Sequence, residues 1–258
     1  MAAGPADTAR MDDAGLLFDR AELADAIETG ELFGWKKRRY LAFRETMRET
    51  AYPCHFAVEA ERDDTARYLF AGDARDRDAL LKLRAGLGQY LDRYRSIADR
   101  TTCVVFFEPP DGVRTEAAYR DRFWSVLEFL HERDPEPWPS TVPADPDDPE
   151  WEFCFAAEPL FVVGRAPFYA DRQSRHTPHG LEMTFQPRGT LEDITGDTPE
   201  GKKARTAIRA RVAEYDDVDL HPDIGDYGDP ATREWKQYLP PRSNDESLGE
   251  FPFEMDTG

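Results

Sequence analysis

The stretch "WEFCFAAEPLFVVG", residues 151–164, decides the fold. Two short apolar runs stand on either side of an Ala-Glu-Pro segment, and this pattern predicts two neighbouring antiparallel strands joined by a turn. Cys154 lies between two phenylalanines in the first run, so we expect it to be a small packing residue.

Working outward from this pair, further strands and helices follow in irregular order. "TTCVVFFEPP", residues 101–110, is β-branched and aromatic and stops at two prolines, which predicts a buried strand with Cys103 in the core. "LEMTFQPRG", residues 181–189, predicts another strand, and residues 58–72 predict a hairpin around a charged turn. Apolar residues at helical spacing predict helices at 16–30, 40–49, 76–98 and 119–130, and residues 199–215 suggest a basic-faced helix.

The irregular order of elements predicts the fold class and the domain limits. A doubly wound parallel sheet needs regular alternation of strand and helix, so we expect an α+β fold, with a mainly antiparallel sheet flanked by helices. We expect one domain over residues 14–240, in which the proline-rich residues 134–150 form a loop. Residues 1–13 are expected to be a flexible N-terminus, and residues 241–258 a loose acidic tail.

Charge is the strongest global property of the sequence. The 258 residues carry 52 acidic and 33 basic side chains, a net charge of −19, which repels nucleic acid and anionic lipid. Such an aspartate-rich, lysine-poor chain is typical of a halophilic protein whose hydrated carboxylates are screened by salt. No apolar run is long enough to span a membrane, and no secretory signal pattern opens the chain, so we expect a cytoplasmic protein.

"YPCHFA", residues 52–57, contains the most informative cysteine. Pro53 cannot continue a helix, so Cys54 leaves a turn at a defined angle. Its thiolate could attack a substrate, bind a soft metal or a heme iron, or its side chain could simply pack. If a strand begins here, His55 points to the opposite face and is a poor direct partner for Cys54.

Two other stretches offer polar groups for a site. In "SRHTPHG", His176 and His179 have a spacing that can chelate a metal, although most such pairs do not. In "TFQPRG", Gln186 and Arg188 place an amide and a guanidinium at a sheet edge, where Arg188 could grip a carboxylate or form a salt bridge. The chain has no GxSxG elbow, no phosphate-binding glycine loop and no HExxH, so nothing indicates nucleotide binding or serine hydrolysis.

The succession of these pieces resembles the YqcI/YcgG family over roughly residues 30–240. The resemblance rests on "YPCHFA", "CVVFFEPP", "FWSVLEFLHERDPEPWP", "FCFAAEPLFVVG", "SRH", "TFQPRG" and "YGDPATREWKQY", in that order. It implies a heme-dependent enzyme that hydroxylates nitrogen in guanidine groups. The cofactor would be heme b, bound non-covalently because no CxxCH motif is present.

The same resemblance implies roles for individual residues. Cys54 would be the proximal ligand of the iron, with His55, His176 and His179 as the alternatives. Arg175 and Arg188 would bind heme propionates or a substrate carboxylate, while Trp124 and Gln186 would contact a small-molecule substrate. An electron donor protein is a further expected partner. Two other hypotheses stay open: a heme-binding or ligand-binding protein without turnover, and a transferase or hydrolase with a cysteine nucleophile.

Overall fold

A computed structural model describes residues 16–191 and 198–255. Six strands form one mixed sheet in the order β1-β2-β3-β6-β5-β4. The strands are β1 (Leu17–Phe18), β2 (Ala66–Gly72), β3 (Thr102–Phe107), β4 (Phe153–Phe155), β5 (Glu158–Arg165) and β6 (Glu182–Pro187). Only β2 and β3 pair in parallel, and every other neighbouring pair is antiparallel. The predicted α+β fold with a mainly antiparallel sheet is therefore confirmed.

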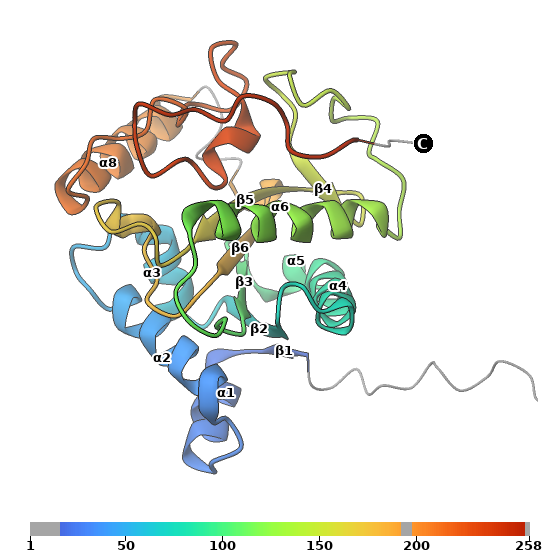
Figure 1. Cartoon of the computed structure of the whole chain (residues 1–258), viewed down its shortest axis with the longest axis vertical. Coiled ribbons are helices and arrows are strands. Elements are labelled where there is room, and N and C mark those ends of the chain that lie inside the picture. The colour runs from blue at the N-terminus through green and yellow to red at the C-terminus, as the bar shows by residue number, and fades with distance from the viewer. Residues whose placement is uncertain (1–15, 192–197, 256–258) are drawn as a thin grey trace, which may run out of the picture.

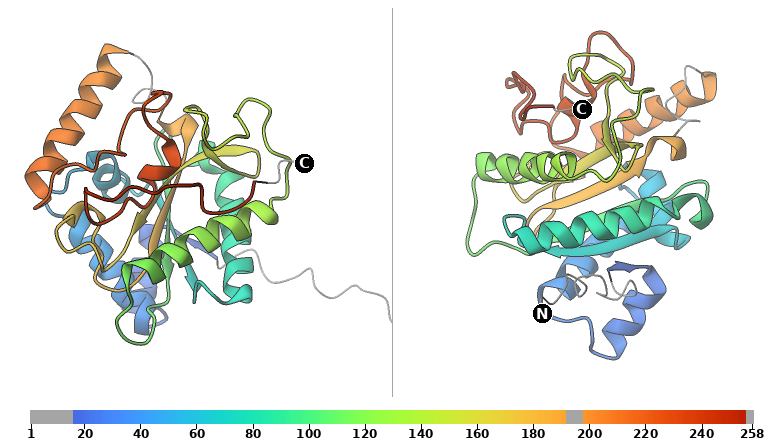
Figure 2. Two further views of the ribbon diagram at one scale, coloured as in Figure 1. Left: turned by 45° about the horizontal axis from the view of Figure 1, so that its top comes forward. Right: turned by 90° about the vertical axis from the view of Figure 1, so that its right-hand side faces the viewer.

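Helices cover both faces of the sheet (Figure 1). The helices are α1 (Arg20–Glu28), α2 (Gly34–Met47), α3 (His55–Arg62), α4 (Arg77–Leu91), α5 (Tyr94–Ile97), α6 (Glu116–Glu132) and α8 (Pro199–Tyr215). The described residues also contain three short 3-10 turns, which are η1 (Gln173–Arg175), η2 (Arg188–Thr190) and η3 (Glu234–Gln237). Figure 2 shows α4 and α6 side by side on one face.

The central strand β3 explains why the core has two halves. All six of its residues are buried, and successive side chains point to opposite faces. Cys103, Val105 and Phe107 join the core formed with α4 and α6. Val104 and Phe106 join the second core, which α1, α2 and α3 complete. Cys103 and Cys154 are both buried in strands, as their apolar surroundings predicted.

The hairpin expected at 58–72 is wrong in its first half. Residues up to Arg62 lie in α3, and only residues 66–72 form a strand, β2. The charged segment between them turns at Asp64, whose φ is +60°. The apolar run before Asp64 is so short that its pattern fits both a buried helix face and a strand. It forms a helix because α3 packs against the sheet.

Two other boundaries also differ from expectation. Leu17 and Phe18 form strand β1 against β2 instead of beginning a helix. The tight turn of the β4–β5 hairpin is Ala156–Ala157, and Glu158 and Pro159 already belong to β5. Proline is tolerated there because it stands near the start of its strand.

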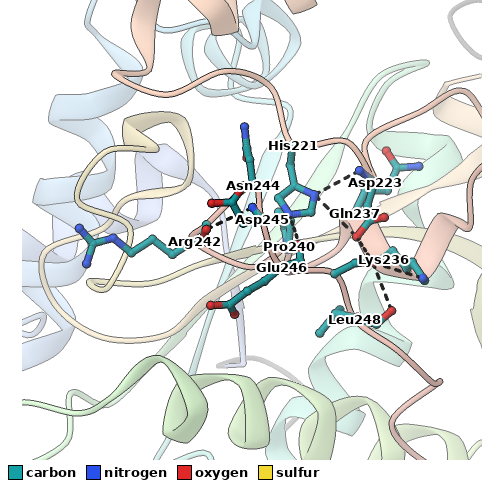
Figure 3. A network of polar contacts seen from close by, with 12 residues as sticks. His221, Asp223, Lys236, Gln237, Pro240, Arg242, Asn244, Asp245, Glu246 and Leu248 are labelled. Atoms are coloured by element: carbon teal, nitrogen blue, oxygen red, sulfur yellow. Dashed lines mark hydrogen bonds and ion pairs between the residues drawn. The ribbon is translucent and has the colours of Figure 1, made fainter.

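The C-terminal segment is packed, not loose, over residues 241–255. Leu248 is buried, and Phe251, Phe253 and Met255 pack against the core. Figure 3 shows this segment folding around buried His221, whose Nε2 lies 3.0 Å from the carbonyl oxygen of Glu246. The expectation of a loose tail came from its acidic composition and missed these spaced apolar side chains. Residues 1–13 and 256–258 lie outside the described residues, and no helix among the described residues is long and apolar enough to cross a membrane.

Candidate functional site

Cys54 stands at the start of α3, directly after the turn made by Pro53. The cysteine is the residue before the first helical residue, His55, and it is half-buried. Arg211 of α8 fixes the preceding turn, because its Nη2 donates to the carbonyl oxygen of Tyr52 at 2.6 Å. The thiol is thus held at the amino end of a helix, where the helix dipole favours a negative charge.

A cavity of about 320 Å³ opens beside Cys54, a volume typical of small-molecule sites. Its walls come from α2, α3, the β3, β5 and β6 strands, and α8. Most of the lining is apolar: Phe43, Met47, Tyr52, Phe56, Val104, Phe161, Val163, Ile208 and Val212 are among its residues. The cavity therefore offers an apolar slot with one thiol on its wall.

The environment of Cys54 acts on its charge in two directions. Burial raises the pKa of the thiol above its ordinary value. The backbone N–H groups of Ala57 and Phe56, followed by the guanidinium groups of Arg175 and Arg165, act in the opposite direction. Without a bound cation the thiol is protonated at neutral pH, and the groups that oppose burial are those that would stabilise a thiolate.

Two arginines on the cavity wall, the buried Arg172 and the half-buried Arg175, have no carboxylate partner within ion-pair distance among the described residues. Arg175 donates to the carbonyl oxygens of Gln237 (3.0 Å) and Tyr238 (3.2 Å). Arg172 donates to Asn244 Oδ1 at 2.7 Å, and its Nε is buried without a hydrogen-bond partner. Burial lowers the pKa of both guanidinium groups. An anion bound between them would offset this cost of burying positive charge.

Four other cavity arginines pair with carboxylates. Arg165 pairs with Glu182 (2.7 Å), and Arg205 and Arg209 of α8 both pair with Asp226. Arg188, which we expected to bind an anion, lines the cavity but is held between two buried glutamates. Its position was predicted, whereas its pairing with the glutamates makes it a weaker anion site than Arg175.

Of the other predicted site residues, only Gln186 lines this cavity. Trp124 lies in the core on the opposite face, where its ring stands 6.0 Å from that of Trp235. His55 borders a separate depression and does not line the cavity of Cys54. The two residues diverge as expected, although the expectation assumed a strand and the chain here begins helix α3. His176 Nδ1 faces the carbonyl oxygen of Tyr169 at 3.1 Å, and neither His176 nor His179 is among the described cavity residues.

The amphipathic spacing of α6 explains why Trp124 packs in the core and does not contact the cavity, contrary to expectation. An aromatic residue on the inner face of α6 packs against the core whether or not a site is near, and Trp124 is 5% exposed. No group of three or more His, Cys, Asp and Glu side chains suited to a metal ion occurs in residues 16–191 and 198–255. The HxxH spacing of His176 and His179 therefore does not gather further ligands of these types in this part of the chain.

The sequence reasoning missed Arg165, Arg172 and the arginines of α8. One signal was present: Arg172 and Arg175 are three residues apart, and Arg205 and Arg209 are four apart, so each pair can share one side of a turn or helix. Nothing in one sequence shows that these pairs converge on the cavity of Cys54.

Comparison with known proteins assigns the chain to a family. It is 34% identical to the uncharacterised protein YcgG of Bacillus subtilis (strain 168), over 86% of this chain and 89% of the relative. It is 33% identical to YqcI of the same organism, over 92% and 94% of the two chains. It is 30% identical, over 91% and 90%, to a Streptomyces lavendulae protein named putative N(omega)-hydroxy-L-arginine synthase DcsA. No solved structure matches the chain.

The family model covers the cavity as well as the sheet. It matches residues 43–254, which include Cys54, Arg172, Arg175 and the packed C-terminal segment. The chain belongs to the YqcI/YcgG family.

Proposed function

We propose that this protein is a heme-dependent oxygenase that hydroxylates a nitrogen of a small guanidine-like or amine substrate. The observation that carries the proposal is the thiol of Cys54 on the wall of a cavity that also holds the buried Arg172 and the half-buried Arg175, neither of which has a carboxylate within ion-pair distance in the part of the chain that the structure describes. The name of the Streptomyces relative, putative N(omega)-hydroxy-L-arginine synthase, supports the nitrogen chemistry.

The residues of the cavity suit the chemistry of heme b. The porphyrin is flat and apolar, which suits walls made by side chains such as Phe43, Phe161 and Val163. Its two propionates are anions, which suits Arg172 and Arg175. Its iron accepts a thiolate, and Cys54 is the only cysteine among the described cavity residues.

Bound heme would supply dioxygen activation, which a thiolate ligand favours by pushing electron density toward the iron. Hydroxylation converts substrate N–H to N–OH and forms one water. It consumes one dioxygen, two electrons from a donor and two protons. The chain must therefore bind the substrate, keep bulk water out and provide protons.

The cavity also has carboxylates that suit a cationic substrate. Asp216, Asp226 and Glu234 line it together with the apolar residues. Asp226 and Glu234 already pair with arginines, whereas Asp216 accepts hydrogen bonds from Ser174. A guanidinium or ammonium group would pair with Asp216, since opposite charges in a partly dry site attract strongly. The wall of the cavity carries Arg172 and Arg175 as well as these carboxylates. It can therefore hold a ligand that carries both a negative and a positive group.

A spectroscopic titration tests the proposal. Heme added to the purified protein should give a saturable Soret band, and the reduced carbon monoxide complex should absorb at the position typical of thiolate ligation. Cys54→Ser should fold but bind heme weakly and lose the thiolate spectrum, because a neutral hydroxyl is a poor iron ligand. Cys103→Ala is the matched control, since Cys103 lies in the core on the opposite face of the sheet and should leave the spectrum unchanged.

Each other result has a definite meaning. No heme binding by the wild type overturns the proposal. An unchanged spectrum in Cys54→Ser places the iron ligand elsewhere. A thiolate spectrum without dioxygen-dependent turnover of guanidines or amines, given a chemical reductant, favours the alternative of a non-catalytic heme-binding protein.

A further inference from the structure

Three charged residues beside the cavity form a cluster with unequal numbers of positive and negative groups. Arg188 Nε donates to Glu152 Oε2 at 2.6 Å, and Arg188 Nη2 donates to Glu234 Oε1 at 3.1 Å. The side chains of Glu152 and Glu234 are 0% and 3% exposed. One guanidinium therefore faces two carboxylates that have almost no contact with water.

The sequence explains how the cluster assembles. Register pairs Phe153 with Leu160 and Leu160 with Pro187, so the first residue of β4 and the last residue of β6 lie in one row across β5. Glu152 precedes the first of these residues and Arg188 follows the last. Glu234 begins η3, which the chain brings back over the same edge of the sheet.

In residues 16–191 and 198–255, no second positive group forms an ion pair with either glutamate. The ring of Tyr227 lies 3.7 Å from the guanidinium of Arg188, but its hydroxyl donates to the carbonyl of Glu150. The hydroxyl of Tyr238 accepts from the N–H of Phe153 and donates to the carbonyl of Leu160. Other polar or titratable groups near the cluster are Gln237, which donates to Glu234 Oε2 at 2.9 Å, and Cys154 and Glu158.

One atom of the cluster is left without a partner. Glu152 Oε1 is buried and accepts no hydrogen bond, whereas both oxygens of Glu234 are bonded. A buried ionised carboxylate with an unsatisfied oxygen is costly. A proton on the carboxyl pair removes both the excess negative charge and part of this cost.

We propose that the Glu152–Arg188–Glu234 cluster holds one dissociable proton at neutral pH and exchanges it with the cavity through Glu234. Arg188 and Glu234 line the cavity that contains Cys54, and Glu152 lies behind them. The role of this proton rests on the proposed function, because the cluster would provide one of the two protons that N-hydroxylation consumes. The existence of the proton is independent of heme.

Electrostatics agree with this geometry. Burial raises the pKa of Glu152 to about 8 although the Arg188 guanidinium lowers it, and Glu234 and Glu158 act in the same direction as burial. Burial also raises the pKa of Glu234. Because the two carboxyl groups interact, the proton belongs to the pair and not to either residue alone.

Infrared spectroscopy of the heme-free protein tests the first half of the proposal. At about pH 7 the wild type should show the stretching band of one protonated carboxyl group, which should fade as the pH rises beyond about 8. Glu152→Gln and Glu234→Gln should each lose the band, because Arg188 alone then balances the remaining carboxylate. Glu61→Gln is the matched control, because Glu61 is a buried carboxylate that already has its own guanidinium, Arg44, at 3.0 Å.

Transfer into deuterium oxide tests the second half. The band should shift to its deuterated position as soon as the folded protein is mixed with deuterium oxide. The exchange should be fast because Glu234 borders the cavity and the protein need not unfold. No protonated carboxyl at neutral pH, or a band that survives in both variants, overturns the proposal. A band as slowly exchanging as the core amides overturns the exchange through Glu234. All three results are obtained without heme, so a failure of heme binding would count against the proposed function and not against the cluster.

Discussion

At the scale of single residues, the three cysteines differ in what they can do. Cys54 is half-buried and borders a cavity, whereas Cys103 and Cys154 are buried in strands. Burial raises the pKa of all three thiols, so none is an activated nucleophile in the absence of a bound cation. This argues against the hypothesis of a cysteine-based transferase or hydrolase.

Alkylation at defined pH measures this difference directly. At about pH 7, Cys54 should react with iodoacetamide more slowly than a free cysteine, because less of it is thiolate. The rate should rise with pH above the range in which a free thiol has levelled off. Cys103 and Cys154 should react only after unfolding. Peptide mapping by mass spectrometry would assign each product, and a Cys54 that outpaces free cysteine at neutral pH would revive the nucleophile hypothesis.

The limits of sequence reasoning are clear at this scale. Pro53 and Cys54 could be recognised because proline sets the backbone locally, and Gln186 and Arg188 because they end a strand. The partners of Arg188 could not be recognised, since Glu152 and Glu234 are 36 and 46 residues away in sequence. Pairing across such distances is set by the sheet register and by the return of η3, which no local pattern encodes.

At the scale of elements, the β4–β5 turn shows strain. Ala156 and Ala157 have φ values of +53° and +57°, a region in which the Cβ atom of a non-glycine residue is crowded. Two-residue hairpin turns with both φ values positive usually contain Asn or Gly. The native turn therefore uses residues that do not favour its backbone conformation, and this is why the sequence did not locate it.

Ala157→Gly should stabilise the protein, since Ala157 is exposed and contributes only its strained Cβ. We expect a gain of about 0.5–1 kcal/mol in the free energy of unfolding, measured by denaturant titration. Ala207→Gly, at an exposed position in the middle of α8, is the control and should lose about 1 kcal/mol, because glycine is unfavourable inside a helix. A loss of stability in both variants would show that the turn is not strained.

Most elements could be predicted because their periodicity is strong. The helix α4 carries seven buried residues at helical spacing, and β3 is a run of β-branched and aromatic residues. The helix α3 could not be predicted, because its eight residues present too few turns for the period to show. Its identity matters most, since its first turn sets the direction of Cys54.

At the scale of the whole molecule, positive and negative charges are separated. The chain has a net charge of −19, yet seven arginines line the cavity of Cys54: Arg100, Arg165, Arg172, Arg175, Arg188, Arg205 and Arg209. Glu182, Glu152, Glu234 and Asp226 neutralise part of this charge from within. The acidic excess therefore lies outside the site, and it does not indicate the charge of the ligand.

This separation leads to a prediction about salt. Exposed carboxylates repel one another, and the Debye length falls from about 30 Å at 0.01 M to about 3 Å at 1 M salt, so screening should favour the folded state. The buried ion pairs, such as Arg165–Glu182, are shielded from salt and should weaken little. We therefore expect the midpoint of thermal unfolding to rise with potassium chloride concentration, steeply at first and less so beyond about 1 M.

A charge-reduced variant separates screening from other effects of salt. Conversion of five exposed carboxylates to amides changes the net charge from −19 to −14 and should flatten the dependence on salt; suitable positions are Glu28, Glu31, Asp92, Asp121 and Glu128. The variant should also be the more stable protein at low salt, because less repulsion remains to be screened. Two results would contradict this prediction: a wild-type midpoint that stays flat or falls with salt, or a midpoint that rises equally with salt in both proteins. Either would show that salt does not act by screening surface repulsion and would contradict adaptation to a salt-rich environment.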